Sequence, residues 1–309
     1  MTVPPGQTPE PQESQPMPGC ARHPDRPTGL RCVRCDRPMC PECLREASVG
    51  YQCVDCVAKA ERGSRRPVTV AGARLSTKPV IVPVLVALNV LVYVASAVQA
   101  GSAMNNARSG LFSALAMWSP AVTGAGQWWR LVTSGFLHIG LLHLVVNMIA
   151  LWVIGRDLEL VLGRLRFSAV YLLAMLGGST AVFLFGELSR PVAGASGAIY
   201  GLMGGIAIAA LRLKLNMRSI LMVIGINIVL TISIPGISLL GHLGGLVIGG
   251  VATAAMLYAP VSRRNLWQSG ALVALLVVLV LALITRDLQL GDVMCVRGPQ
   301  GLQCYSPRG

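Results

Sequence analysis

Residues 191–211 read PVAGASGAIYGLMGGIAIAAL, a run of 21 residues without Asp, Glu, Lys or Arg. A bilayer-spanning helix needs about 20 predominantly apolar residues, so this run predicts a transmembrane helix. Charge-free intervals of similar or greater length lie at 79–107, 131–155, 167–186, 219–262 and 265–285. The interval 219–262 carries Pro235-Gly236, a turn pair, near its middle and therefore predicts two helices. The sequence thus predicts an all-α polytopic membrane protein with seven transmembrane helices.

Composition and charge agree with this class. Of the 309 residues, 53% are hydrophobic and only 13% are charged, about half the charged fraction of a soluble domain. The net charge of +13 follows the spans: thirteen Lys and Arg precede span one or follow spans two, four and six. This asymmetry predicts a cytoplasmic N-terminus and an extracytoplasmic C-terminus, and it explains the basicity without a nucleic-acid partner. With 3 Lys against 23 Arg, the composition suggests a bacterial plasma (inner) membrane.

Cysteine pairs dominate the polar N-terminal region. Residues 1–18, rich in Pro, Gln and Ser, predict a disordered leader. Four two-ligand pairs follow, each with the two-residue spacing of zinc ligands: Cys20 with His23, Cys32 with Cys35, Cys40 with Cys43, and Cys53 with Cys56. Eight ligands predict two structural Zn²⁺ ions, whereas a disulfide framework is disfavoured in the reducing cytosol. Because protein ligands fill every coordination position of both ions, the expected use of this module is a binding surface for a cytosolic partner.

Strongly polar residues within the spans mark a candidate site. Apart from His23, the histidines of the chain are His138, His143 and His242, and all fall in or beside predicted spans. Such residues in a membrane are functional candidates because their burial is costly without partners or water. His143 and Asn147, four residues apart, share one helix face.

A serine and a histidine are predicted to meet across two glycine-rich helices. Glycines recur every fourth residue at 197, 201 and 205 and again at 241, 245 and 249, which permits close helix contact. Ser196 and His242 adjoin the first glycine of each series and lie at corresponding depths. Close packing of the two helices would therefore bring a hydroxyl and an imidazole together. That pair predicts a nucleophile with its general base, and His143 and Asn147 could stabilise an oxyanion. As single residues, Ser196 could be a packing residue and His242 an interhelical hydrogen-bonding group.

These motifs resemble those of the rhomboid intramembrane serine proteases. The similarity covers about residues 79–260 and includes Trp129-Arg130, His138-x4-His143-x3-Asn147, Glu159-x3-Gly163, Gly194-x-Ser196-Gly197 with Tyr200, and Gly241-His242-x2-Gly245-x3-Gly249. The resemblance implies a Ser196–His242 dyad and an oxyanion site formed by His143, Asn147 and the Ser196 backbone N–H. It further implies that Tyr200 packs on the imidazole, Gly194 lines the oxyanion hole and Gly245 is a packing position.

The resemblance also sets the expected architecture and activity. Six spans would surround a water-filled cavity, span five would gate lateral entry, and membrane-protein substrates would be cut in or next to transmembrane segments without a catalytic cofactor. The N-terminal cysteine stretch resembles a B-box-type zinc finger, whose alternating ligands would pair Cys20, His23, Cys40 and Cys43 on one ion; sequential pairing is the alternative. The predicted domains are the leader (1–18), zinc-binding module (19–60), basic linker (61–78), six-span core (79–260), seventh transmembrane helix (261–286) and extracytoplasmic tail (287–309).

Other functions compete with proteolysis. A noncatalytic relative could bind membrane clients without cutting them, although such relatives usually lack the Ser or the His. A metalloprotease or metal transporter is disfavoured because no carboxylate lies near the intramembrane histidines in sequence. If the zinc module were the functional part, one span would suffice as its anchor. In the tail, Cys295 and Cys304 either form a disulfide or remain free thiols.

Overall fold

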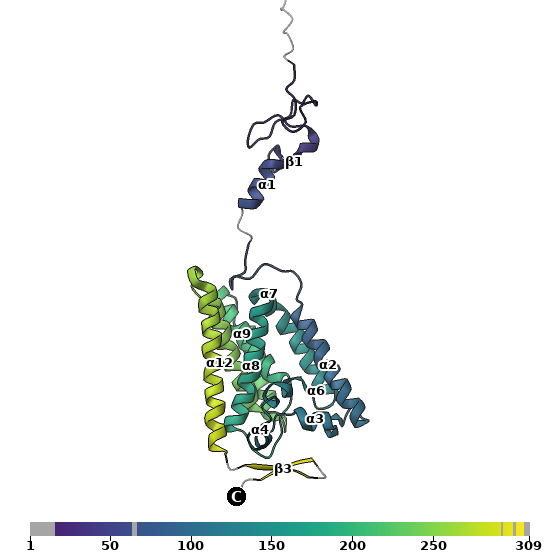
Figure 1. The fold of residues 1–309 in the computed structure, drawn as a ribbon, viewed down its shortest axis with the longest axis vertical. Coiled ribbons are helices and arrows are strands. Elements are labelled where there is room, and N and C mark those ends of the chain that lie inside the picture. The colour runs from purple at the N-terminus through teal and green to yellow at the C-terminus, as the bar shows by residue number, and fades with distance from the viewer. Residues whose placement is uncertain (1–15, 64–66, 292, 299–300, 306–309) are drawn as a thin grey trace, which may run out of the picture. The chain divides into compact units, whose positions relative to one another are not determined.

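A computed structural model describes residues 16–63, 67–291, 293–298 and 301–305. The chain forms two compact units, Met1–Arg66 and Pro67–Gly309 (Figure 1). Most of the predicted leader, residues 1–15, lies outside the described residues, as do residues 64–66 of the predicted linker.

The N-terminal unit is small and built around its cysteines. It contains the 3-10 turn η1 (Pro41–Cys43), an antiparallel pair of strands β1 (Leu44–Glu46) and β2 (Tyr51–Cys53), and helix α1 (Val54–Gly63). Among the residues of this unit that the structure describes, the apolar core holds only Met39 and Leu44 apart from five buried cysteines. So little apolar burial cannot stabilise a fold of this length, which is the situation in which a bound metal supplies the missing free energy.

The second unit is a helical bundle that spans a membrane several times. Five described helices are long and apolar enough to cross a bilayer: α2 (Ile81–Ala100), α8 (Arg164–Phe185), α9 (Ser196–Leu213), α11 (Leu239–Leu257) and α12 (Arg264–Gln289). A sixth crossing is formed if one bent pair of helical segments counts as a single span. Helix α10 (Arg218–Ser233), with 16 residues, is shorter. Five of the seven predicted spans, or six with the bent pair, are therefore confirmed as candidate spans, and α10 lies where the fifth was predicted. Helix α10 is separated from α11 at the predicted Pro235-Gly236 turn, where Gly236 has a φ of +89°.

The second span differs from the single helix expected over 131–155. Helix α5 (Arg130–Thr133) and the turn η3 (Ser134–Phe136) bend by 92° into α6 (Gly140–Ala150), with Gly140 at a φ of +72°. The chain continues through the π-helical turn η4 (Leu151–Gly155) into α7 (Arg156–Leu162), so charged residues extend the helix beyond the charge-free interval. His138 consequently lies in the bend and not in the helix.

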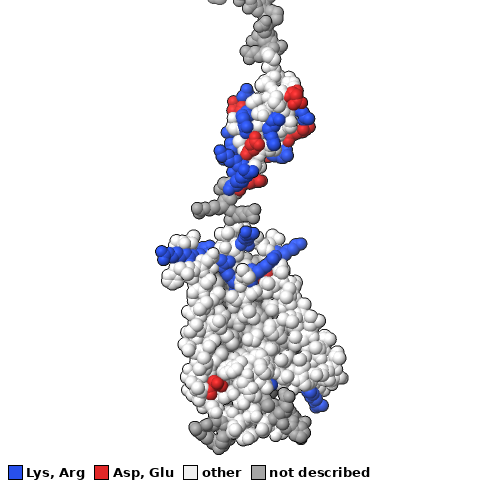
Figure 2. Space-filling view, in the orientation of Figure 1, with Lys and Arg blue, Asp and Glu red and all other residues white. Residues whose placement is uncertain are grey.

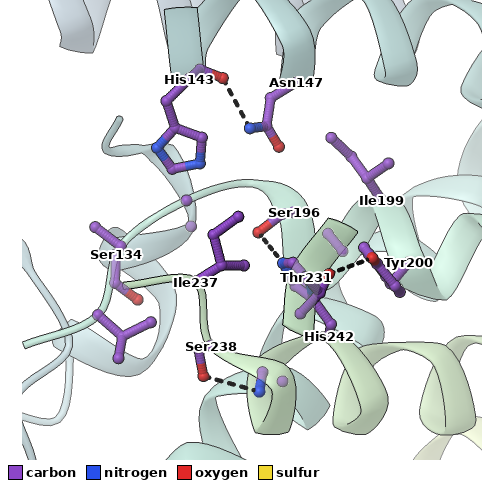
Figure 3. A pocket seen from close by; sticks show the side chains of 18 of the residues that line it. Ser134, His143, Asn147, Ser196, Ile199, Tyr200, Thr231, Ile237, Ser238 and His242 are labelled. Carbon is purple, nitrogen blue, oxygen red and sulfur yellow. Dashed lines mark hydrogen bonds between the residues drawn. The ribbon is translucent and has the colours of Figure 1, made fainter. Parts of the chain in front are cut away.

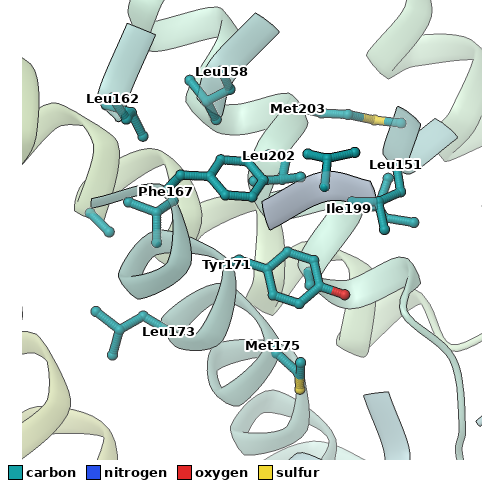
Figure 4. Packing of buried hydrophobic residues seen from close by; sticks show 14 of the residues in the cluster. Leu151, Leu158, Leu162, Phe167, Tyr171, Leu173, Met175, Ile199, Leu202 and Met203 are labelled. Carbon is teal, nitrogen blue, oxygen red and sulfur yellow. The ribbon is translucent and has the colours of Figure 1, made fainter. Parts of the chain in front are cut away.

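Glycines bring α9 and α11 into backbone contact at the centre of the bundle. A Cβ added at Gly245 would strike the carbonyl of Gly197, and one added at Gly249 would strike the backbone of Gly201. Beside this seam, the main apolar cluster fills the space between α7, α8 and α9 with Leu158, Phe167, Tyr171 and Leu202 among others (Figure 4). The seam fixes the separation of the two helices that carry Ser196 and His242.

Two buried ionic side chains organise the backbone around this bundle. Both carboxylate oxygens of Glu159, which is 2% exposed, accept hydrogen bonds from the first backbone N–H groups of α2, at 2.7–3.0 Å. Arg130, 3% exposed, donates to the carbonyls of Ser113 and Ala116 in the segment between α2 and α5. Both groups satisfy backbone atoms that have no helical partner, which is a structural role.

The short elements between α2 and α5 are η2 (Asn106–Arg108), α3 (Gly110–Leu115) and α4 (Ser119–Ala125), and η5 (Val261–Arg263) precedes α12. Helix α12 is held to the bundle by Gln268, whose amide donates to the carbonyls of Ala71 and Met256. Ala71, fully buried, belongs to the main cluster, so part of the predicted 61–78 linker is core of the second unit. This difference arises because burial depends on partners far away in the sequence.

The predicted tail holds an antiparallel hairpin of β3 (Met294–Gly298) and β4 (Gly301–Tyr305). Cys295 and Cys304 are opposite one another in this hairpin and are joined by a disulfide. The Cys295 sulfur lies 3.3 Å from the Pro120 carbonyl, so the hairpin contacts α4. Lys and Arg side chains gather at the opposite end of the second unit (Figure 2), where Arg74, Lys78, Arg164 and Arg166 line a shallow cavity.

Candidate active site and metal-binding tetrads

Ser196 and His242 are in hydrogen-bond contact. Ser196 is the first residue of α9, and His242 lies in the first turn of α11. The serine Oγ is 2.7 Å from the imidazole Nε2 (Figure 3). The glycine contacts between α9 and α11 make this distance attainable, because any larger side chain in the seam would separate the two helices.

One face of the His242 ring and its Nδ1 edge are also in contact with neighbouring side chains. Tyr200, one turn after Ser196 on α9, stacks on the imidazole with ring centroids 4.0 Å apart and planes inclined by 17°. Thr231 of α10 places its Oγ1 2.8 Å from the imidazole Nδ1. The ring is therefore held on one face and at both nitrogens.

His143 and Asn147 stand across the cavity from the serine, on α6 (Figure 3). The backbone N–H of Ile139 donates to His143 Nδ1 at 3.2 Å. A neutral imidazole that accepts at Nδ1 carries its proton on Nε2, so His143 Nε2 is a hydrogen-bond donor. Asn147 Nδ2 donates one proton to the carbonyl of His143 at 2.8 Å, which leaves its second N–H unused by that bond.

Gly194 leaves the space between these groups open. Its φ of +141° is a conformation that residues with a side chain rarely adopt. An added Cβ would lie 3.1 Å from His143 Nε2 and 3.4 Å from Ser196 Oγ. A ligand atom in this space could therefore reach both the serine and the donor nitrogen.

These residues line a cavity of about 590 Å³, a typical volume for a ligand-binding site. Its walls include apolar residues of α6, α8, α9 and α10, and the 234–238 connection before α11 closes one side. No described residue lining the cavity is Asp or Glu. Acid–base chemistry at this site would therefore depend on imidazole.

The structure thus brings together most of the residues singled out by sequence. Ser196, His242, His143, Asn147, Gly194 and Tyr200 line the cavity, whereas Gly245 packs behind it in the helix seam. His138 is fully buried with its ring 5.1 Å from that of His143. Thr231 was not singled out, because a threonine bonding to its own helix is ordinary in transmembrane segments and the sequence gives no sign of its contact with His242.

The eight N-terminal ligands form two tetrads in the alternating arrangement. Cys20, His23, Cys40 and Cys43 make one, and Cys32, Cys35, Cys53 and Cys56 make the other. Within each tetrad the donor atoms lie within 4.8 Å of one another. Each tetrad could hold a metal ion, and its cysteine-rich donor set suits zinc.

Thiol acidity in the tetrads fits this use. Burial raises the pKa of the Cys20 thiol, but hydrogen bonds from backbone N–H groups outweigh burial and lower it to about 6. Cys32 is lowered to a pKa of about 6 in the same way. Burial and the neighbouring thiols instead raise the pKa of Cys43 to about 11. Clustered thiolates repel one another, so full deprotonation of a tetrad calls for a cation between them.

Comparison with known proteins agrees with the geometry. The family model described as "Rhomboid domain" matches residues 125–260. The chain is 36% identical to Rhomboid protease GluP of Bacillus subtilis (strain 168) over 58% of its own length and 35% of that relative. It is 34% identical to RHOMBOID-like protein 6, mitochondrial, of Arabidopsis thaliana, covering 61% of the chain and 69% of the relative. It is 27% identical to Rhomboid-type serine protease 2 of Emericella nidulans, over 45% of the chain and 29% of the relative. The chain therefore belongs to the rhomboid family.

Proposed function

We propose that this protein is an intramembrane serine endopeptidase that hydrolyses peptide bonds in or next to transmembrane segments of other membrane proteins. The observation that carries the proposal is the 2.7 Å contact between Ser196 Oγ and His242 Nε2 in a cavity of a membrane-spanning bundle. The names of GluP and of the fungal relative, both proteases, support it.

The chemistry follows from the site's atoms. His242 Nε2 takes the Ser196 proton as Oγ attacks the substrate carbonyl, and the protonated imidazole then donates that proton to the departing amine. A water, deprotonated by the same imidazole, hydrolyses the acyl-enzyme and restores the serine. His143 Nε2, Asn147 Nδ2 and the Ser196 N–H, which has no helical acceptor, stabilise the oxyanion.

The cavity also indicates the form of the substrate. A transmembrane helix engages its carbonyls in its own hydrogen bonds, so a bond can be attacked only where the helix has unwound. Cleavage is therefore expected near helix-breaking positions, and the resemblance to rhomboid proteases implies a small residue at the cut. The apolar walls contributed by α6 and α10 suit a substrate that arrives from the lipid bilayer.

We infer the orientation of the chain in its membrane from the distribution of charge. The end of the second unit that holds Arg74, Lys78, Arg164 and Arg166 is assigned to the cytoplasmic side, with the N-terminus, and the disulfide hairpin to the opposite side. The bacterial inner membrane stays a prediction from composition. We further infer that the two tetrads hold structural Zn²⁺ ions; a cytosolic partner of this module stays a prediction from sequence.

The test is cleavage of a single-span substrate with a small-residue, helix-destabilised site in proteoliposomes. The full chain is compared with Ser196→Ala, His242→Ala and Ser262→Ala, the last removing an exposed hydroxyl on η5. Cleavage by the wild type and Ser262→Ala alone supports the proposal.

A noncatalytic client-binding protein is the competing function. It predicts no cleavage by the wild type while an active rhomboid protease cuts the same substrate, together with no labelling of Ser196 by a fluorophosphonate probe. Labelling that disappears in both Ser196→Ala and His242→Ala would instead indicate an active dyad with a narrower substrate range.

A further inference from the structure

The Nδ1 edge of His242 contacts Thr231, a residue outside the motifs that this chain shares with the family. A serine nucleophile needs Nε2 of its base unprotonated, which in neutral imidazole requires the proton to sit on Nδ1. In triad enzymes a carboxylate accepts from Nδ1 and fixes this tautomer. Here the described residues that line the cavity include no carboxylate, and Nδ1 faces the hydroxyl of Thr231 at 2.8 Å.

The other hydrogen bonds of Thr231 favour one direction for that contact. Its Oγ1 donates to the Asn227 carbonyl, four residues earlier on α10, at 2.9 Å. A hydroxyl has one proton and two lone pairs, so with its proton on Asn227 it can only accept from its other neighbours. Those neighbours are the Tyr200 hydroxyl at 2.6 Å and His242 Nδ1. When Tyr200 O–H and His242 Nδ1–H both donate to Thr231, every lone pair and proton of the hydroxyl is used.

We propose that Thr231 is a positioning residue that holds His242 in the tautomer with Nε2 free to accept the Ser196 proton, a task that a carboxylate performs in triad enzymes. This inference rests on the proposed function. The opposite tautomer, with Nε2–H donating to Ser196, cannot act as a base. It would also require Thr231 to withdraw its proton from Asn227 and donate to Nδ1.

The location of Thr231 links this role to the side of the cavity formed by α10. Thr231, 4% exposed, is the one buried residue of α10, whose other residues are exposed or half-buried. Any displacement of α10 that carries Thr231 beyond hydrogen-bond reach releases Nδ1 as well. The position of α10 and the orientation of the base are therefore linked through one hydroxyl.

The test combines kinetics with a direct measurement of the tautomer. Thr231→Val removes the hydroxyl at nearly constant shape, and Thr231→Ser restores it. Ser233→Ala is the matched control, because Ser233 makes the same bond to the carbonyl four residues earlier, at 2.8 Å, on the exposed side of the same helix. Each full-length variant is labelled with ¹⁵N-imidazole histidine and studied at about pH 8, well above the ordinary imidazole pKa of about 6.5.

The chain has four histidines, so the His242 nitrogens can be assigned as the signals lost in His242→Ala. In the wild type, Thr231→Ser and Ser233→Ala, we expect His242 to carry its proton on Nδ1. Thr231→Val should shift population to Nε2–H and lower kcat about tenfold, the value of one hydrogen bond, with KM little changed. The serine variant should recover most of that loss.

Two results would overturn the inference. One is a Thr231→Val protein that retains the Nδ1–H tautomer, whatever its activity, since any loss of rate would then be structural. The other is a wild type whose His242 carries its proton on Nε2. If the wild type fails to cut while an active relative cuts the same substrate, the proposed function fails separately, and the ¹⁵N signals still decide whether Thr231 fixes the tautomer.

Discussion

Substitution of Gly245 by alanine should separate the two helices that carry the dyad. A Cβ at this position would collide with the carbonyl of Gly197, the residue next to Ser196, and would lie 3.2 Å from its Cα. Helix α11 would have to move by roughly 1 Å relative to α9 to relieve the collision. The Ser196–His242 contact, now 2.7 Å, would then exceed the normal range of a hydrogen bond.

Misplacement of reacting groups by about 1 Å can cost about 100-fold in rate, so we expect that loss in kcat. Overpacking costs about 1–3 kcal/mol, and the better helix propensity of alanine returns about 1 kcal/mol. The free energy of unfolding should therefore fall by about 0–2 kcal/mol. The increase in the activation free energy of cleavage should exceed this decrease in the free energy of unfolding.

Gly250→Ala provides the matched control on the same helix. The atoms nearest to a Cβ added at Gly250 lie 3.9 Å away, which is an ordinary contact. This variant should therefore retain its activity and gain up to about 1 kcal/mol of stability. Initial cleavage rates in proteoliposomes and thermal unfolding of both variants make the comparison. The reasoning is refuted if Gly245→Ala cuts as fast as Gly250→Ala, since close packing would then not set the dyad geometry.

Three further predictions address other parts of the chain. Glu159→Gln should lower the free energy of unfolding by about 2 kcal/mol, because the buried Glu159 carboxylate accepts hydrogen bonds from the backbone at the start of α2. Asp157→Asn removes a carboxylate from an exposed pair with Arg156 and should change the free energy of unfolding by less than about 1 kcal/mol. Thermal unfolding that ranks the two variants otherwise contradicts this prediction. Asn147→Ala should reduce kcat about 100-fold with little change in KM, as loss of an oxyanion donor does, and a pure KM effect in steady-state kinetics would refute the role. Elemental analysis should find two Zn²⁺ per chain. Chelation should expose residues 19–60 to limited proteolysis, whereas fluorophosphonate labelling of Ser196 should persist. Unchanged proteolysis after metal loss would show that the module folds without metal.

The sequence by itself determined the features that depend on local pattern. Span positions follow from the length of charge-free intervals, because the bilayer thickness sets a minimum apolar length. The ligand pairs of the N-terminal module follow from a spacing of two residues, and the proximity of Ser196 and His242 follows from two glycine seams that repeat at the helical period. Each of these signals is contained in a short window of residues.

Only the tertiary structure decided which groups meet over long distances. Glu159 contacts the start of α2 about eighty residues earlier, Ala71 joins the core from within a predicted linker, and His138 lies in a 92° bend that no run of apolar residues announces. Thr231 is the clearest case, because its helix and sequence context are ordinary and its role comes entirely from the hydroxyl's place between Tyr200 and the imidazole. Hydrogen bonds are short and directional, so their partners are fixed by the packing of whole helices and not by spacing along the chain.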